Sequence, residues 1–165
     1  MLNKTELTVN VKEYDELEVA YIRHIGPYKG DSALFDRLYG QICGWAGPRG
    51  LITSDTKFIS VYYDDPEITE ESKLRLDVCL SIPPDTEVKA PFGKMKIPKG
   101  KYAVCLFNLG PKDYPEAWNF IYGEWLPNSG FQPDDRPSYE NYLSSPKDDP
   151  NGNCKVEIFV PVKPV

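Results

Sequence analysis

The sequence is poor in the residues from which metal sites and acid–base sites are usually built. His24 is the one histidine among 165 residues, and Cys43, Cys79, Cys105 and Cys154 form no C-x-x-C pair. Because zinc sites need several Cys or His ligands at short spacing, we expect no metal site. Cys79 and Cys105 lie in apolar runs, so we expect reduced thiols in the core. Glycine motifs for phosphates and dinucleotides are also missing, and we expect no cofactor.

Positive charge and long apolar runs are scarce as well. Lys and Arg number 19 against 25 Asp and Glu, which gives a formal net charge of -6. A chain that binds nucleic acid directly needs a clustered excess of Lys and Arg, so we expect no such binding. No apolar run is long enough for a membrane span or resembles a signal peptide, and we expect a cytoplasmic protein without membrane contact.

What the sequence does contain is an internal repeat. Gly26-Pro27 falls on Gly110-Pro111 at an offset of 84 residues. Further along, the offset is 80, and the matching pairs are Trp45 with Trp125, Gly50 with Gly130, Tyr62 with Tyr142, and the run LDVCL (76–80) with VEIFV (156–160). The pattern indicates a duplication with one short deletion in the first connection.

Each copy shows the same order of elements. A β-rich run ends at Gly-Pro, a helical segment follows (DSALFDRLYGQICGWAG, then YPEAWNFIYGEWLP), and two more strands complete the copy. We therefore predict one α+β domain over residues 1–165, with module one at about 5–84, a connection at about 85–98 and module two at about 99–165. The connection contains GKMKI, a candidate short strand. Helices on one face of an antiparallel sheet leave the other faces to form a central ligand cleft between pseudo-twofold halves.

The most informative mismatch between the copies is Ser60 against Glu140. Strand alternation puts Phe58, Ser60 and Tyr62 on one face, which we assign to the cleft, and Ile59, Val61 and Tyr63 on the face covered by the helix. By the same offset Glu140 and Tyr142 face the cleft. A carboxylate there needs a partner, and a cationic ligand could supply it. Alternatively, Glu140 pairs with Arg23, Arg136 or a backbone amide, or lies at a solvated edge.

An aromatic stripe and the histidine are further candidates. Trp118, Tyr122 and Trp125 recur at helical spacing, so they form either core or a wall that holds a cation through its aromatic faces. His24 has Asn108 as its counterpart and no Ser or Cys partner at a motif spacing. We therefore expect a structural polar role for it rather than acid–base chemistry.

Several long motifs together resemble one known family. They are VAYIRHIGPY, ISVYYDDPEITEESKLRLDVCLSIPPDT, IPKGKYAV, YGEWLPNSGFQPDDRPSYENYLSSP and VEIFVPVKP. They are similar to the GyrI-like domain, also described as the effector-binding domain of AraC-type transcription regulators. The resemblance implies paired strand-helix-strand-strand modules around a cleft for cationic or amphipathic molecules. It also implies that Glu140 is a pocket residue, with Trp118, Tyr122, Trp125, Tyr142 and Phe58 as its aromatic surroundings.

The resemblance leaves several functions open. The leading expectation is binding of a small, cationic or amphipathic aromatic molecule, either by a stand-alone protein or by the effector domain of a regulator whose DNA-binding part lies upstream. Alternatives are inhibition of DNA gyrase by protein contact and hydrolysis of strained cyclopropane-containing toxins. No catalytic residue is expected in a binding protein; in a hydrolase Glu140 would be the acid or base, beside Trp125 or Tyr122.

Overall fold

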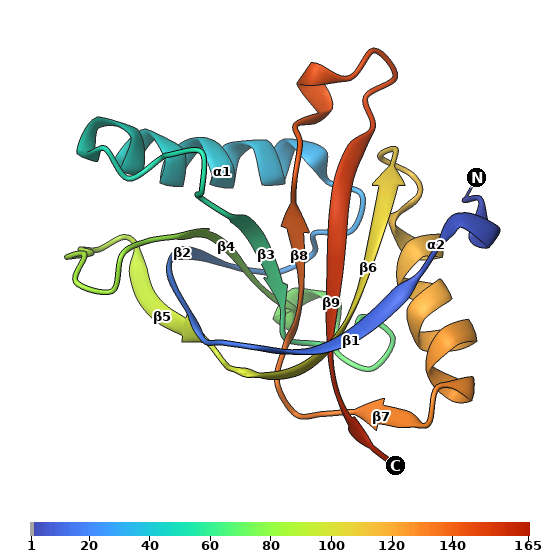
Figure 1. Cartoon of the computed structure of the whole chain (residues 1–165). Coiled ribbons are helices and arrows are strands. Elements are labelled where there is room, and N and C mark those ends of the chain that lie inside the picture. Colours follow the sequence, from blue (N-terminus) through green and yellow to red (C-terminus); the bar gives the residue numbers. More distant parts are fainter. Residues whose placement is uncertain (1) are drawn as a thin grey trace. The chain divides into compact units, whose positions relative to one another are not determined.

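The computed structural model describes residues 2–165, and the chain divides into two compact units (Figure 1). Glu16–Pro98 form the central unit. The residues up to Asp15 join Lys99–Val165 to form the terminal unit. Within the described residues, no helix is long and apolar enough to cross a membrane.

The central unit is a four-stranded antiparallel sheet with one long helix. Its strands are β2 (Leu17–Ile25), β3 (Phe58–Tyr62), β4 (Arg75–Ser81) and β5 (Gly93–Ile97), in the order β3-β4-β2-β5. Helix α1 (Ser32–Ala46) begins after Asp31, whose carboxylate accepts a hydrogen bond from the Leu34 amide at 3.1 Å, as an N-cap should. Leu34, Leu38 and Ile42 recur at helical spacing and are buried, and this apolar stripe fixes α1 on the sheet.

The terminal unit has five strands and a short, irregular helix. Its strands are β1 (Val9–Tyr14), β6 (Gly100–Leu109), β7 (Phe131–Pro133), β8 (Ser138–Tyr142) and β9 (Cys154–Pro164), in the order β1-β6-β9-β8, with β7 pairing with the end of β9. Helix α2 (Tyr114–Asn119) continues as a π-helical turn (Phe120–Trp125) and a 3-10 turn (Leu126–Asn128). Further 3-10 turns are Lys4–Glu6, Gly47–Arg49, Glu71–Lys73 and Pro146–Asp148.

The boundaries of the units differ in two ways from the expected modules. Strand β1 pairs with β6, so residues 9–14 belong to the terminal unit, although the sequence pattern placed them in module one, at about 5–84. The candidate strand GKMKI is confirmed as β5, and it extends the central sheet by pairing with β2. A sequence repeat reports equivalent residues, but it does not report which strand an extra edge strand joins.

Strand registers confirm the offset of 80 and correct the offset of 84. Ser60 lies opposite Val78, and Glu140 lies opposite Ile158, so both strands of this pair are shifted by 80 residues. In the strand that precedes them in each copy, Arg23 of β2 lies opposite Asp77, and Leu106 of β6 lies opposite Glu157. Equivalent residues of β2 and β6 are therefore 83 positions apart in the sequence, and not 84.

The difference arises in the turns that follow these strands. Gly26 has a φ of 134° and donates to the Leu74 carbonyl, whereas the amide of Gly110 donates to the Asp113 carboxylate at 2.8 Å. The two Gly-Pro turns therefore do not superpose residue by residue. The expected counterpart of His24, Asn108, was wrong by one residue: the register gives Phe107.

The predicted assignment of faces in β3 was also wrong. Ser60 hydrogen-bonds with Tyr39 of α1, with 3.0 Å between the hydroxyl oxygens. Phe58 and Tyr62 pack into the same cluster as the buried face of α1. Ile59 and Val61, on the opposite face, are buried as well. Because both faces are apolar, alternation tells which residues share a face but not which face the helix covers.

Candidate functional site

The predicted pocket carboxylate, Glu140, is buried between β8 and α2. Its side chain is 2% exposed. The Trp118 indole donates to Oε2 at 2.7 Å, and the Tyr142 hydroxyl donates to Oε1 at 2.5 Å. Burying a carboxylate costs several kcal/mol unless such donors satisfy it. Arg136, proposed as an alternative partner, pairs with Asp134, and Arg23 pairs with Asp77. Glu140 thus lies on the helix-covered face rather than the expected cleft face.

The negative charge of Glu140 affects the pKa of the neighbouring Tyr114 hydroxyl. Burial raises the pKa of Tyr114 well above its usual range, and the negative charge of Glu140 adds to the effect. Tyr114 begins α2, and it packs against the core of the terminal unit. The surroundings of Glu140 are therefore apolar and aromatic, as its sequence context suggested.

The structure brings only some of the predicted aromatic residues together. Trp118 stacks on Tyr122 with ring centroids 6.0 Å apart, and the Tyr122 hydroxyl hydrogen-bonds with Ser138 at 2.7 Å. Trp125 stacks on Phe131 instead. Two residues of the stripe, Trp118 and Trp125, pack against the core of the terminal unit, whereas the third, Tyr122, is 38% exposed. Tyr142 of β8 packs against the same core. Phe58 belongs to the other unit and packs with the cluster of α1.

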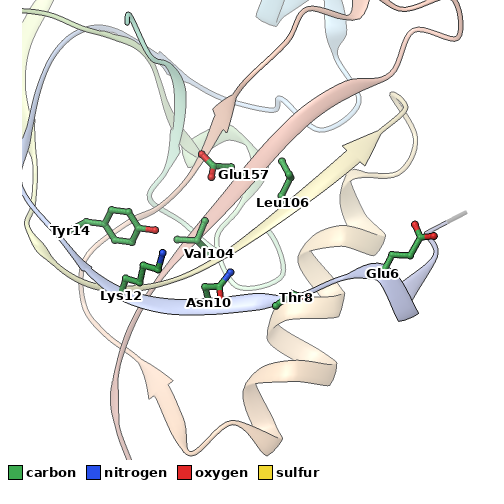
Figure 2. A pocket seen from close by; sticks show the side chains of 8 residues that line it. All are labelled: Glu6, Thr8, Asn10, Lys12, Tyr14, Val104, Leu106 and Glu157. Atoms are coloured by element: carbon green, nitrogen blue, oxygen red, sulfur yellow. The ribbon is translucent and has the colours of Figure 1, made fainter.

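The opposite face of the terminal sheet contains a hollow of about 340 Å³ (Figure 2). We call it the Glu157 hollow; its lining residues are Glu6, Thr8, Asn10, Lys12, Tyr14, Val104, Leu106 and Glu157. Glu157, on β9, lies opposite Leu106 of β6 and Asn141 of β8. The Asn141 amide donates to its Oε1 at 3.0 Å.

An aromatic cluster adjoins the hollow. Tyr139 stacks on Phe159 with centroids 4.5 Å apart, and Tyr14 meets Phe159 edge-on at 5.2 Å. Tyr14 belongs to both the cluster and the hollow. Its pKa is raised, first by burial and then by the negative charge of Glu157. The hollow has a largely polar lining that combines a carboxylate with an aromatic edge and two apolar side chains, Val104 and Leu106. A carboxylate beside an aromatic ring is a combination that suits a cation.

Sequence reasoning missed Glu157, although a signal was present. In VEIFV the acidic residue interrupts an apolar strand, and its match in LDVCL is Asp77, also acidic. The mismatch of Ser60 with Glu140 is the stronger signal in the sequence, because at Asp77 and Glu157 the copies agree in charge.

A metal ion has no evident site in the part of the chain that the structure describes. Within residues 2–165, no three side chains of His, Cys, Asp or Glu are grouped closely enough to hold one. Cys79 and Cys105 are buried and carry free thiols, in agreement with the sequence prediction.

Comparison with known proteins points to one family. The model of the GyrI-like small molecule binding domain matches residues 7–163. A DNA gyrase inhibitor of Yersinia enterocolitica is 29% identical, with 95% of this chain and 98% of that protein aligned. The EcmrR C-terminal domain has a TM-score of 0.76 at 20% identity, over 97% of this chain and 99% of that one. SAV2435, solved bound to tetraphenylphosphonium, has a TM-score of 0.60 at 13% identity, over 94% of each chain.

Proposed function

Because the chain belongs to the GyrI-like small-molecule-binding family, we propose that it binds a small organic cation in the Glu157 hollow. One observation carries the proposal: Glu157 has a neutral donor, Asn141, but no ion pair with any residue from 2 to 165. A ligand cation at this carboxylate would supply the missing charge partner. Val104, Leu106 and Tyr14 would contact the apolar part of the ligand (Figure 2).

The charge and size of the hollow support a cation. Glu6 and Glu157 outnumber the one lining cation, Lys12, so the formal charge of the lining is negative. Its volume of about 340 Å³ falls in the range of small-molecule sites. SAV2435, similar in fold, was solved with a lipophilic cation, which makes this class of ligand the first to test.

That Glu140 binds the ligand stays a prediction from the sequence, and in this structure it would require a hydrogen-bond donor of Glu140 to move away. Both of its oxygens accept hydrogen bonds from Trp118 and Tyr142, so a ligand would have to displace at least one of these donors. Displacing Trp118 would also separate it from Tyr122 in α2. Phe58 and a cleft between the two modules likewise stay predictions. The Glu157 hollow needs none of them.

Isothermal titration with matched cations and neutral isosteres tests the proposal. Phenyltrimethylammonium and tert-butylbenzene have the same shape but differ in charge, and benzamidinium and benzamide form a second such pair. We expect binding of at least one cation, neither neutral compound, and at least tenfold weaker binding by Glu157→Gln. Glu140→Gln is the matched control and should keep the affinity. Binding that is lost in Glu140→Gln and retained in Glu157→Gln would transfer the site to Glu140.

A second candidate function is inhibition of DNA gyrase, because the similar Yersinia protein is a DNA gyrase inhibitor and aligns over nearly its whole length. A supercoiling assay with purified gyrase tests it. Inhibition that persists in Glu157→Gln would show that gyrase contact uses a different surface from the cation site, and no inhibition at high protein concentration would remove this candidate. A role as a regulator's effector domain stays a further prediction from the family.

A further inference from the structure

The two units place an acidic residue at the same position of their sheets. Asp77 of β4 and Glu157 of β9 are 80 residues apart, which is the offset of the strand pairs around them. Each lies directly opposite a residue of the preceding strand of its module: Arg23 of β2 faces Asp77, and Leu106 of β6 faces Glu157. The central unit thus shows how this fold holds a cation at the acidic position.

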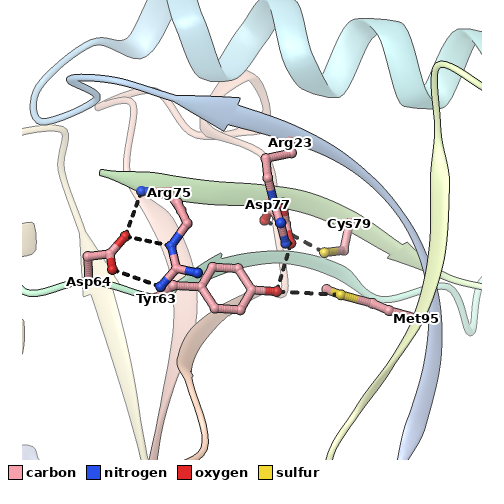
Figure 3. Close-up of polar contacts among 7 residues, drawn as sticks. All are labelled: Arg23, Tyr63, Asp64, Arg75, Asp77, Cys79 and Met95. Atoms are coloured by element: carbon pink, nitrogen blue, oxygen red, sulfur yellow. Dashed lines mark hydrogen bonds and ion pairs between the residues drawn. The ribbon is translucent and has the colours of Figure 1, made fainter. Parts of the chain in front are cut away.

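In the central unit, a planar cation of the chain itself fills that position (Figure 3). The Arg23 guanidinium donates twice to the Asp77 carboxylate, Nε to Oδ1 at 2.8 Å and Nη2 to Oδ2 at 2.7 Å. The Tyr63 hydroxyl adds a third, neutral donor to Oδ2 at 2.7 Å. The guanidinium also lies over the rings of Tyr21 and Tyr63, 5.6 and 5.2 Å from their centroids. Asp77 is fully buried under this arrangement.

In the terminal unit, the corresponding side chain carries no charge. Leu106 is 52% exposed and lines the Glu157 hollow. Glu157 keeps one neutral donor, Asn141, as Asp77 keeps Tyr63. The aromatic rings differ: the counterparts of Tyr21 and Tyr63 are Val104 and Leu143, and the ring beside Glu157 is Tyr14 of β1. The position of the carboxylate in the sheet is therefore shared, whereas the side chains around it are specific to the hollow.

Building on the proposed function, we propose that the ligand of the Glu157 hollow is a guanidinium or amidinium with an apolar or aromatic substituent, held by Glu157 as Arg23 is held by Asp77. A planar cation with two parallel N–H donors matches a carboxylate bidentately. A quaternary ammonium or phosphonium has the charge but no donor. The substituent contacts Val104, Leu106 and Tyr14.

Titration with two cations of similar size tests this preference. Benzamidinium should bind at least tenfold more tightly than phenyltrimethylammonium, and Glu157→Gln should remove most of that difference because the bidentate charged acceptor is gone. Equal affinities, or tighter binding of the quaternary cation, would overturn the preference while leaving the proposed function intact. If neither cation binds the wild-type protein at millimolar concentration, the proposed function fails and this inference fails with it.

A second variant tests the comparison between the units. Leu106→Arg places a guanidinium opposite Glu157, as Arg23 lies opposite Asp77. Because the Leu106 side chain is half-exposed, the fold should tolerate the change, which circular dichroism verifies. We expect Leu106→Arg to weaken benzamidinium binding at least tenfold, whereas Leu106→Met, of similar length and uncharged, should bind within threefold of wild type. Unchanged binding by a folded Leu106→Arg would overturn the inference.

Discussion

At the scale of single residues, both buried carboxylates within residues 2–165 accept hydrogen bonds from side-chain donors. Asp77 is fully buried and depends on Arg23 and Tyr63, and Glu140 depends on Trp118 and Tyr142. Removing one partner of such a group costs more than the bond itself because the charge stays buried. The paired residues therefore stabilise the fold, whereas Glu157 lines the hollow where we propose that a ligand binds.

The Arg23 and Asp77 pair gives a prediction about stability. Arg23→Met should lower the free energy of unfolding by about 2–4 kcal/mol, because it leaves Asp77 buried and charged; partial exposure of Arg23 keeps the loss within that range. The double variant Arg23→Met, Asp77→Leu should recover most of this loss. Urea unfolding measures both. A double variant that is less stable than Arg23→Met would contradict the account.

A surface pair gives a prediction about pH. The Arg75 guanidinium beside Asp64 holds the pKa of that carboxyl below its usual value. A lowered pKa in the folded state contributes stability above the unfolded pKa of about 3.9, and the contribution is lost as the pH falls through the folded value. The advantage of wild type over Asp64→Asn should be about 1 kcal/mol or less at pH 7 and should shrink below about pH 4. A difference that stays constant from pH 7 to pH 3 would exclude the ion pair as its source.

At the scale of elements, the two helices differ in how firmly they are held. Helix α1 has 15 residues, a capped start and four buried residues on one face. Helix α2 has six residues and continues through π and 3-10 turns, with weaker hydrogen-bond geometry. Helix α2 contacts β8 through the hydrogen bond that Trp118 donates to Glu140. We therefore expect α2 to depend on that bond more than α1 depends on Tyr39 and Ser60.

Hydrogen exchange tests this difference between the helices. Glu140→Gln turns one acceptor oxygen into a donor that faces Trp118 or Tyr142, at a cost of about 1–3 kcal/mol. Amide protection over residues 114–125 should fall, while the ladder between β8 and β9 keeps its protection. The control, Tyr39→Phe, removes the neutral bond to Ser60 and should leave the protection of α1 nearly unchanged. Equal loss of protection in both helices would contradict the expectation.

At the scale of the whole molecule, the repeat and the order of elements could be predicted from the sequence. The matches at an offset of 80 identified equivalent strands, and their registers agree. For β2 and β6, the Gly-Pro match predicted an offset of 84, whereas the registers give 83. The difference of one residue arises because the backbone of the turn at Gly26 differs from that at Gly110. Two facts were beyond the sequence pattern: which face of an apolar strand a helix covers, and which edge β1 joins. These depend on packing between distant segments, and the first decided the placement of Glu140.

The residues predicted from the sequence and the lining of the Glu157 hollow lie on different faces of the terminal sheet, and packing between distant segments is again the reason. Trp118, Tyr142 and Glu140 do lie together, but as a satisfied cluster under α2. The hollow that Glu157 lines is formed by β1, β6 and β9. In the sequence, β1 lies far from β6 and β9, so the sequence pattern does not show that these strands are neighbours. The sequence signal for this position is the match of Asp77 with Glu157 between the copies.

The most direct test of the central claim is an amide-resolved NMR titration of the wild-type protein with benzamidinium. We expect the largest chemical-shift changes at residues that line the Glu157 hollow, namely Asn10, Lys12, Tyr14, Val104, Leu106 and Glu157. Glu157→Gln should abolish these changes at the same concentration. Changes confined to Trp118, Tyr142 and the rest of the Glu140 cluster, or identical changes in Glu157→Gln, would contradict the claim.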